Sequence, residues 1–279
     1  MVPAWFDPDQ LAALDRWLLP EEEAPTPPAI EPRAAAWKAW VVMIAAPLLL
    51  TWQHYGFSHS RLPTLAGALA AIGLPALQDW MKGPDFTAQD LQLLELLVWS
   101  FGCLVTGLIV PSLLVAIVFR ESPFDYGLRG SIGTRETGLA VIFLIVMVPI
   151  VFFMSDTEAF QSKYPFYRLA PGESLWPRWF IWEIGYALQF VAVEFLFRGF
   201  MVHGLRPQFA GFAVGIMTIP YCLIHFGKPW QETCAAVLAG LALGWLSLRT
   251  RSIWWGVLLH VSVAWSMDTL SLWRTGRLG

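Results

Sequence analysis

The chain contains long apolar runs, and these constrain its fold more than any other feature of the sequence. The clearest run is residues 137–153, TGLAVIFLIVMVPIVFF, which carry no ionisable side chain. About 20 such residues cross the hydrocarbon core of a bilayer, which is about 30 Å thick. Over the whole chain 56% of residues are hydrophobic and only 14% are charged, against about 25% charged in a soluble domain. The chain is therefore predicted to be a multi-pass integral membrane protein, with the lipid bilayer as its surroundings.

The predicted fold class is all-α, a polytopic transmembrane helical bundle. A helix satisfies its own backbone polar groups, which a lipid environment requires. We expect seven spans, or eight if residues 63–79 also cross. That stretch is short, rich in Ala and Gly and interrupted by Pro, so it could instead lie at the interface or re-enter. The seven expected spans are residues 37–53, 91–119, 136–154, 178–202, 208–226, 231–248 and 252–273.

Composition divides the chain into three parts. Residues 1–36 form an acidic, Pro-rich N-terminal tail that includes a candidate short amphipathic helix, WFDPDQLAALDRWLLP. Residues 37–119 hold the first membrane spans, and residues 120–273 hold the rest. The net charge of −3 is too small to indicate nucleic acid or another charged partner.

Arginines mark one side of the predicted membrane protein. They recur after every second crossing, at Arg120, Arg129 and Arg135, then at Arg206, then at Arg249 and Arg251. The positive-inside rule assigns that side to the cytoplasm. Arg274 and Arg277 depart from the rule, because the last span is expected to end on the other side. Seven spans place the N-terminus inside, and eight place it outside.

Ionisable residues at membrane depth are concentrated in the second half of the chain. Each costs about 2.5–3.5 kcal/mol on insertion scales, so such residues rarely persist without a role or a partner. The set is Glu183, Glu194, Arg198, His225, Glu232, His260 and Asp268.

Glu194 and Arg198 are spaced i, i+4 in VAVEFLFRGF, one above the other on a helix face. This spacing by itself favours a buried ion pair. His225 comes just before a Gly-Lys-Pro turn, where a lone histidine is more often an interfacial group than a catalyst. His260 lies about eight residues into the last span, where nothing in the local sequence explains it.

Two further acids accompany the histidines. Asp268 follows His260 by eight residues, about two helical turns, on roughly the same face. Glu232 begins the span between the two histidines, where an acid also has a simple role at a helix N-terminus.

Together, one carboxylate and two imidazoles on three helices form a set able to converge in the bundle. A carboxylate can activate a water molecule, and imidazoles can steer it and stabilise a tetrahedral oxyanion. Two histidines and a carboxylate are also a zinc ligand set, although the H-E-x-x-H pattern is absent. The expected cofactor is therefore none, with zinc as the open alternative. G-x-S-x-G, P-loop and dinucleotide patterns are absent as well.

At these residues the chain resembles the CAAX prenyl-protease and bacteriocin-processing family of intramembrane endopeptidases. EFLFRG is similar to the E-E-x-x-x-R motif of the family, YCLIH (221–225) to its second motif and LLHVSVA (258–264) to its third. The loop PFDYGLRG (123–130) adds to the likeness, which covers about residues 120–270. The resemblance implies that residues 120–273 form a catalytic helical core.

The resemblance implies a role for each matching residue. Glu194 is the carboxylate of the first motif, and Arg198 is its structural partner. His225 helps to hold the attacking water, and His260 helps to form the oxyanion site. The catalytic set is therefore Glu194, His225 and His260.

Two positions depart from the pattern of the family. The first glutamate of the family motif is Val193 here, and the Asn of the third motif is Ala264. Either Glu194 acts as the base of a variant site, or the site is degenerate. Asp268 and Glu232 are candidate replacements for the missing polar groups, and we expect Asp268 to orient His260.

The predicted function is an intramembrane glutamic-type endopeptidase that hydrolyses a peptide bond in or next to a membrane-embedded or lipid-anchored segment. Its partner is then a membrane-anchored protein or peptide substrate, and its expected location is a bacterial inner membrane. The alternative is a proteolytically inactive membrane scaffold or regulator of the same family. A transporter is less favoured, because the sequence has no internal repeat or paired broken helices.

Overall fold

The structure is a computed structural model, and it describes residues 31–57, 62–129 and 134–278. Every regular element in these residues is helical, as the fold class predicted. The candidate amphipathic helix in the N-terminal tail lies outside the described residues.

The helices follow each other along the chain as continuous rods and short pieces. In order they are α2 (Pro32–Gly56), α3 (Leu62–Ala71), α4 (Ala76–Met81), α5 (Ala88–Leu104), α6 (Val110–Leu113), α7 (Thr134–Met154), α8 (Glu158–Gln161), α9 (Arg178–Glu194), α10 (Gly204–Phe209), α11 (Phe212–Leu223), α12 (Trp230–Thr250) and α13 (Trp254–Arg274). The π-helical segments η3 (Val105–Ile109) and η4 (Leu114–Phe119) join α5 and α6 into one rod, and η6 (Phe195–His203) joins α9 to α10. A 3₁₀ turn, η5 (Pro123–Tyr126), follows the first of these rods.

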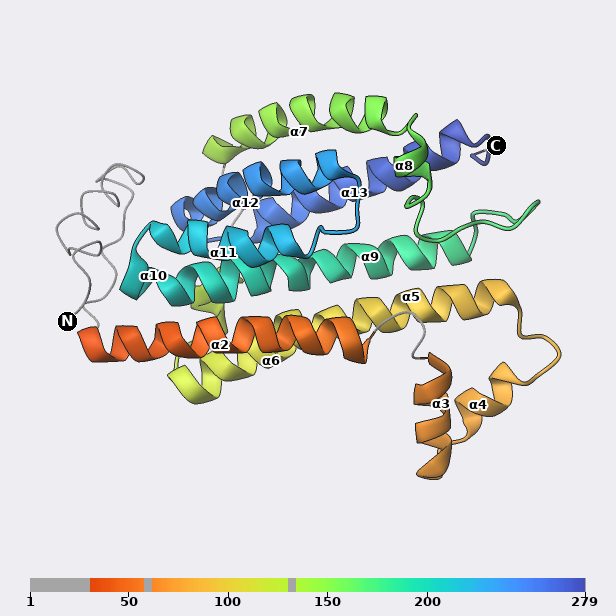
Figure 1. Cartoon of the computed structure of the whole chain (residues 1–279), viewed down its shortest axis with the longest axis horizontal. Helices are drawn as coiled ribbons and strands as arrows, with labels where there is room; N and C mark the ends of the chain where they lie inside the picture. The colour runs from red at the N-terminus through yellow and green to blue at the C-terminus, as the bar shows by residue number, and fades with distance from the viewer. Residues whose placement is uncertain (1–30, 58–61, 130–133, 279) are drawn as a thin grey trace.

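The rod formed by α9, η6 and α10 is central to the bundle. Helices α2 and α5 pack on one side of it, and α11, α12 and α13 lie on the other, with α7 at the outer edge against α13 (Figure 1). Glycine permits one of the closest approaches: a Cβ atom at Gly107 would lie 2.8 Å from the carbonyl oxygen of Ala192 in α9. The largest apolar core surrounds η6 and includes Phe195, Phe197 and Phe200.

Within the residues that the structure describes, five helical segments are long and apolar enough to cross a membrane: Pro32–Gly56, Ala88–Phe119, Glu136–Met154, Arg178–Phe209 and Trp230–Thr250. They correspond to five of the seven expected spans. Helix α13 has the length of a span, 21 residues, but is not among these five. Helix α11 has only 12 residues, about 18 Å at 1.5 Å per residue.

The structure does not support an eighth crossing by residues 63–79. Helix α3 has 10 residues and α4 has 6, and together they form a bent pair at one end of the bundle (Figure 1). Ten residues cover about 15 Å, half of the hydrocarbon core. The helix breaks at Gly73, which adopts a positive φ of 86°.

The outer surface of α7 is apolar and exposed, as contact with lipid requires. Only 11% of its most apolar stretch is buried inside the protein, and Ile142, Ile145 and Phe153 are among its exposed side chains. An apolar surface of this extent is stable only in an apolar medium. The chain is an integral membrane protein.

The Arg-containing loops lie at one end of the bundle, as the sequence predicted. The loop after η4 contacts the start of α13, where Trp254 Nε1 donates to the carbonyl oxygen of Leu128 at 3.0 Å. The start of α2 is joined to the same loop, because Lys38 Nζ lies 2.5 Å from Glu121 Oε1. Arg274, whose position departs from the positive-inside rule, lies at the other end of the bundle. It pairs with Asp156 at 3.5 Å, and the carboxylate offsets its positive charge.

Candidate active site

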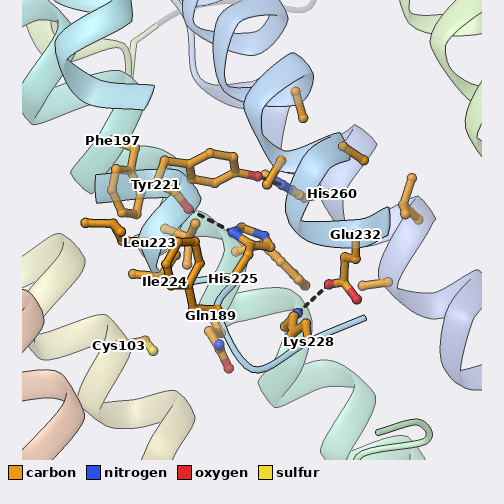
Figure 2. Close-up of a pocket in the computed structure, with 18 of the residues that line it drawn as sticks. Cys103, Gln189, Phe197, Tyr221, Leu223, Ile224, His225, Lys228, Glu232 and His260 are labelled. Atoms are coloured by element: carbon orange, nitrogen blue, oxygen red, sulfur yellow. Dashed lines mark hydrogen bonds and ion pairs between the residues drawn. The ribbon is translucent and has the colours of Figure 1, made fainter. Parts of the chain in front are cut away.

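The early end of α11 creates the site. This helix stops at Leu223, and residues 224–229 continue without regular helical structure to the start of α12. Non-helical backbone at membrane depth is tolerated where it lines a cavity or is buried in protein. His225 lies two residues past the end of α11, close to its expected place at the end of a span, and its side chain is half-buried (Figure 2).

A cavity of about 820 Å³ lies beside this stretch. Its wall is mainly apolar and comes from α2, α5, η3, α7, α9, α11, α12 and α13. The polar side chains along it include Gln53, Tyr164, Gln189, Tyr221, His225, Lys228, Glu232 and His260. An apolar cavity with a few convergent polar groups is the usual form of a binding site.

Glu194 lies at the end of α9 and has no exposed surface. Its Oε1 accepts from Nη1 of Arg198 at 3.0 Å and lies 2.6 Å from Nδ1 of His260. Its Oε2 has no hydrogen-bond partner. The carboxylate is not among the groups that line the cavity, so His260 separates it from the open space.

Arg198 is completely buried in η6, and the predicted i, i+4 ion pair is present. Its Nη2 also donates to the carbonyl oxygen of Ala239 at 3.4 Å. Its guanidinium carbon lies 4.0 Å from the centre of the Tyr221 ring, a cation–π contact. One charged group therefore fixes α9, α11 and α12 relative to each other.

The two histidines approach the cavity from different elements and have different partners. His260 in α13 bridges Glu194 through Nδ1 and the hydroxyl of Tyr221 through Nε2, at 2.6 and 2.7 Å. His225 has its Nδ1 2.8 Å from the carbonyl oxygen of Tyr221. A carbonyl only accepts, so Nδ1 carries the proton, and Nε2 of the neutral ring is an acceptor.

Glu232 lines the cavity, but its carboxylate already accepts hydrogen bonds from two side chains. Lys228 Nζ lies 2.7 Å from Oε1, and the hydroxyl of Tyr164 is 2.9 Å from both carboxylate oxygens. Burial, together with the neighbouring Glu232, raises the pKa of Tyr164 well above its usual value. Tyr164 therefore remains a hydrogen-bond donor at neutral pH, and this cluster closes one part of the cavity wall.

The expected contact between Asp268 and His260 is not formed. Asp268 Oδ2 instead accepts from Nε1 of Trp182 at 3.3 Å, and its carboxyl group lies beside that of Glu183. Two turns of an α-helix amount to 7.2 residues, so eight residues place the two side chains about 80° apart around α13. This offset, together with the position of α9, directs Asp268 to Trp182.

The structure thus brings Glu194, Arg198, His225 and His260 together around one residue to which the sequence assigned no chemistry, Tyr221. The sequence analysis included it only as the first residue of the segment YCLIH (221–225), four positions before His225. Gln189, which also lines the cavity, was missed altogether, because nothing in the spacing of α9 marks it.

Among the residues that the structure describes, no group of three or more His, Cys, Asp or Glu side chains is arranged to hold a metal ion. The His225, His260 and Glu194 side chains therefore do not form a three-ligand cluster there.

Fold and site together define a class of protein, a polytopic helical membrane protein with a buried carboxylate–histidine pair beside an internal cavity. Residues 174–266 match the family model of Rce1-like type II CAAX prenyl endopeptidases. The resemblance to the CAAX-protease and bacteriocin-processing proteins is confirmed over this segment. The match contains Glu194, His225 and His260 but covers a third of the chain. No curated protein and no solved structure matches the chain.

Proposed function

We propose that the protein is an intramembrane endopeptidase that hydrolyses a peptide bond in or next to a membrane-embedded or lipid-anchored segment. The family match supports a membrane endopeptidase of the CAAX type in general terms. The observation that carries the proposal is the hydrogen-bonded chain from Glu194 through His260 to Tyr221, which ends at the cavity wall beside His225.

The cavity supports the class of substrate. Its wall is apolar and lies between helices that face lipid, so a membrane-embedded segment or a lipid-anchored peptide is the substrate that fits it. The partner in this proposal is a membrane-anchored protein or peptide.

The geometry favours a different division of roles from the one expected. Glu194 was expected to activate the water, but it is fully buried and does not line the cavity. His225 lines the cavity with an acceptor nitrogen, so we assign the proton acceptor to His225. Glu194 then acts through His260, whose ring and tautomer it fixes by accepting a hydrogen bond from Nδ1.

The test is cleavage of a membrane-tethered reporter peptide by the full chain in lipid nanodiscs. We expect His225→Ala to lower kcat/KM by about 10²–10⁴-fold, the usual contribution of a general base. Glu194→Gln and His260→Ala should lower it as well. His203→Ala is the matched control, because His203 lies outside the cavity and bonds Ser247. Unchanged cleavage in all three site variants would show that the protein does not work in this way.

The proposal involves no metal. We therefore expect cleavage to persist after treatment with a chelator. Loss of activity with the chelator, followed by recovery with added Zn²⁺, would instead favour the zinc alternative.

An inactive scaffold or regulator of the same family is the second candidate, and two features favour it. Val193 and Ala264 stand where the family motifs have Glu and Asn, and Glu194 has no direct access to the cavity. The two functions differ in a cellular assay. A scaffold keeps its phenotype when Glu194→Gln and His260→Ala are introduced, whereas an enzyme loses it at unchanged protein abundance.

A further inference from the structure

Tyr221 joins the charged and ionisable groups of the site. Its hydroxyl oxygen lies 2.7 Å from Nε2 of His260, and its ring packs against both imidazoles, with centroids 4.8 Å from His225 and 6.0 Å from His260. The ring also carries the guanidinium of Arg198 on its face. Figure 2 shows the hydroxyl directed at His260, next to the ring of His225.

The direction of each hydrogen bond follows from the charges. Glu194 is paired with Arg198 and is therefore an ionised acceptor. Nδ1 of His260 must donate to it, so Nε2 of the neutral ring has a lone pair and no proton. The Tyr221 hydroxyl consequently donates to Nε2. In this series of hydrogen bonds from Glu194 to Tyr221, the final donor is therefore the hydroxyl of Tyr221.

This pattern leaves His260 without an N–H directed at the cavity. Ala264, one turn further along α13, has no donor either. A tetrahedral intermediate formed beside His225 needs a donor for its oxyanion. Along this chain of hydrogen bonds, the donor nearest the cavity is the hydroxyl of Tyr221.

We propose that Tyr221 is a catalytic residue of this site and that its hydroxyl donates a hydrogen bond to the oxyanion of the tetrahedral intermediate. The inference rests on the proposed endopeptidase function. His260 fixes the position of the hydroxyl oxygen before substrate arrives, so the donor only has to rotate its hydrogen towards the oxyanion. Glu194 and Arg198 in turn hold His260 and the tyrosine ring.

The reaction balances with the groups named. The water oxygen forms a bond to the carbonyl carbon, one water proton moves to Nε2 of His225, and the carbonyl π electrons move to the oxygen. Tyr221 keeps its O–H bond and turns the hydrogen from His260 to the new oxyanion. When the C–N bond breaks, His225 returns the proton to the leaving nitrogen.

The first arm of the test is Tyr221→Phe in the same nanodisc assay. We expect kcat to fall about 10²–10³-fold with KM nearly unchanged, because the lost hydrogen bond is made in the transition state. The aromatic contact with Arg198 remains, so the fold should be retained. Tyr167→Phe is the control, since Tyr167 is a buried tyrosine outside the cavity whose hydroxyl donates to Glu173 at 2.7 Å.

The second arm measures the hydrogen bond without relying on turnover. Diethyl pyrocarbonate reacts with an unprotonated ring nitrogen, and mass spectrometry locates the modified histidine. We expect His225 to react faster than His260 in the unmodified protein. Tyr221→Phe should raise the reactivity of His260 several-fold, and Tyr167→Phe should leave it unchanged.

The outcomes separate this inference from the proposed function. Full activity of Tyr221→Phe together with an inactive His225→Ala variant overturns the role of Tyr221 and leaves the endopeptidase standing. A drop in kcat without any change at His260 also overturns it, because the hydroxyl would then not be held by that ring. Absence of cleavage by the unmodified protein overturns both.

Discussion

Replacing Arg198 with alanine is expected to remove most of the folded protein from the membrane. The guanidinium is completely buried and neutralises Glu194, which is also completely buried. Removal of one partner from a buried ion pair typically costs about 3–5 kcal/mol. The variant also loses the contacts with Ala239 and Tyr221. In detergent we expect the melting temperature to fall by on the order of 10 °C, with a matching loss of protein in membrane fractions.

Arg129→Ala is the matched control for this prediction. Arg129 also forms an i, i+4 pair, with Asp125 at 3.6 Å, but both side chains are more than half exposed. An exposed pair contributes about 0–1 kcal/mol, so this variant should melt like the unmodified protein. Glu194→Gln should also be better tolerated than Arg198→Ala, because an amide oxygen still accepts from the guanidinium. An Arg198→Ala protein as stable as the Arg129→Ala protein would contradict the structural role.

Gly256→Ala is expected to disturb the site directly. A Cβ atom at this position would lie 2.0 Å from Oε2 and 2.6 Å from Cδ of Glu194. In a helix, alanine is normally about 1 kcal/mol more favourable than glycine. Here the carboxylate must move, which breaks its short contact with His260. We expect a loss of about 1–3 kcal/mol of stability and a strong loss of reporter cleavage.

Two further variants isolate the cause. Gly215→Ala is the control, because Gly215 lies in α11 and a Cβ atom there would meet nothing within 4 Å. It should be neutral or slightly stabilising. In a Glu194→Ala background the clashing atoms are gone, so Gly256→Ala should cost much less there. Equal costs in both backgrounds, measured by thermal unfolding, would mean that the clash with Glu194 is not the reason.

The sequence predicted most of the membrane architecture. The apolar run at 137–153 and its counterparts predicted helices whose positions agree with the structure to within a few residues, because a fixed bilayer thickness sets their length. The Arg pattern predicted which loops share one end of the bundle. The ion pair of Glu194 and Arg198 was also predictable, since its two members lie on the same helical rod, four residues apart.

Contacts between distant helices were decided by the tertiary structure. Glu194 and His260 are 66 residues apart, and no local spacing distinguishes this partner from Asp268. Helix α11 was expected to reach residue 226, but it stops at Leu223, because an apolar sequence does not mark the residue at which a helix ends beside a cavity. Sequence periodicity determined which residues face the interior, whereas packing among α9, α11 and α13 determined which of them meet. Hydrogen bonds depend on that packing to within tenths of an ångström, so the chain from Glu194 through His260 to Tyr221 exists only in the folded bundle.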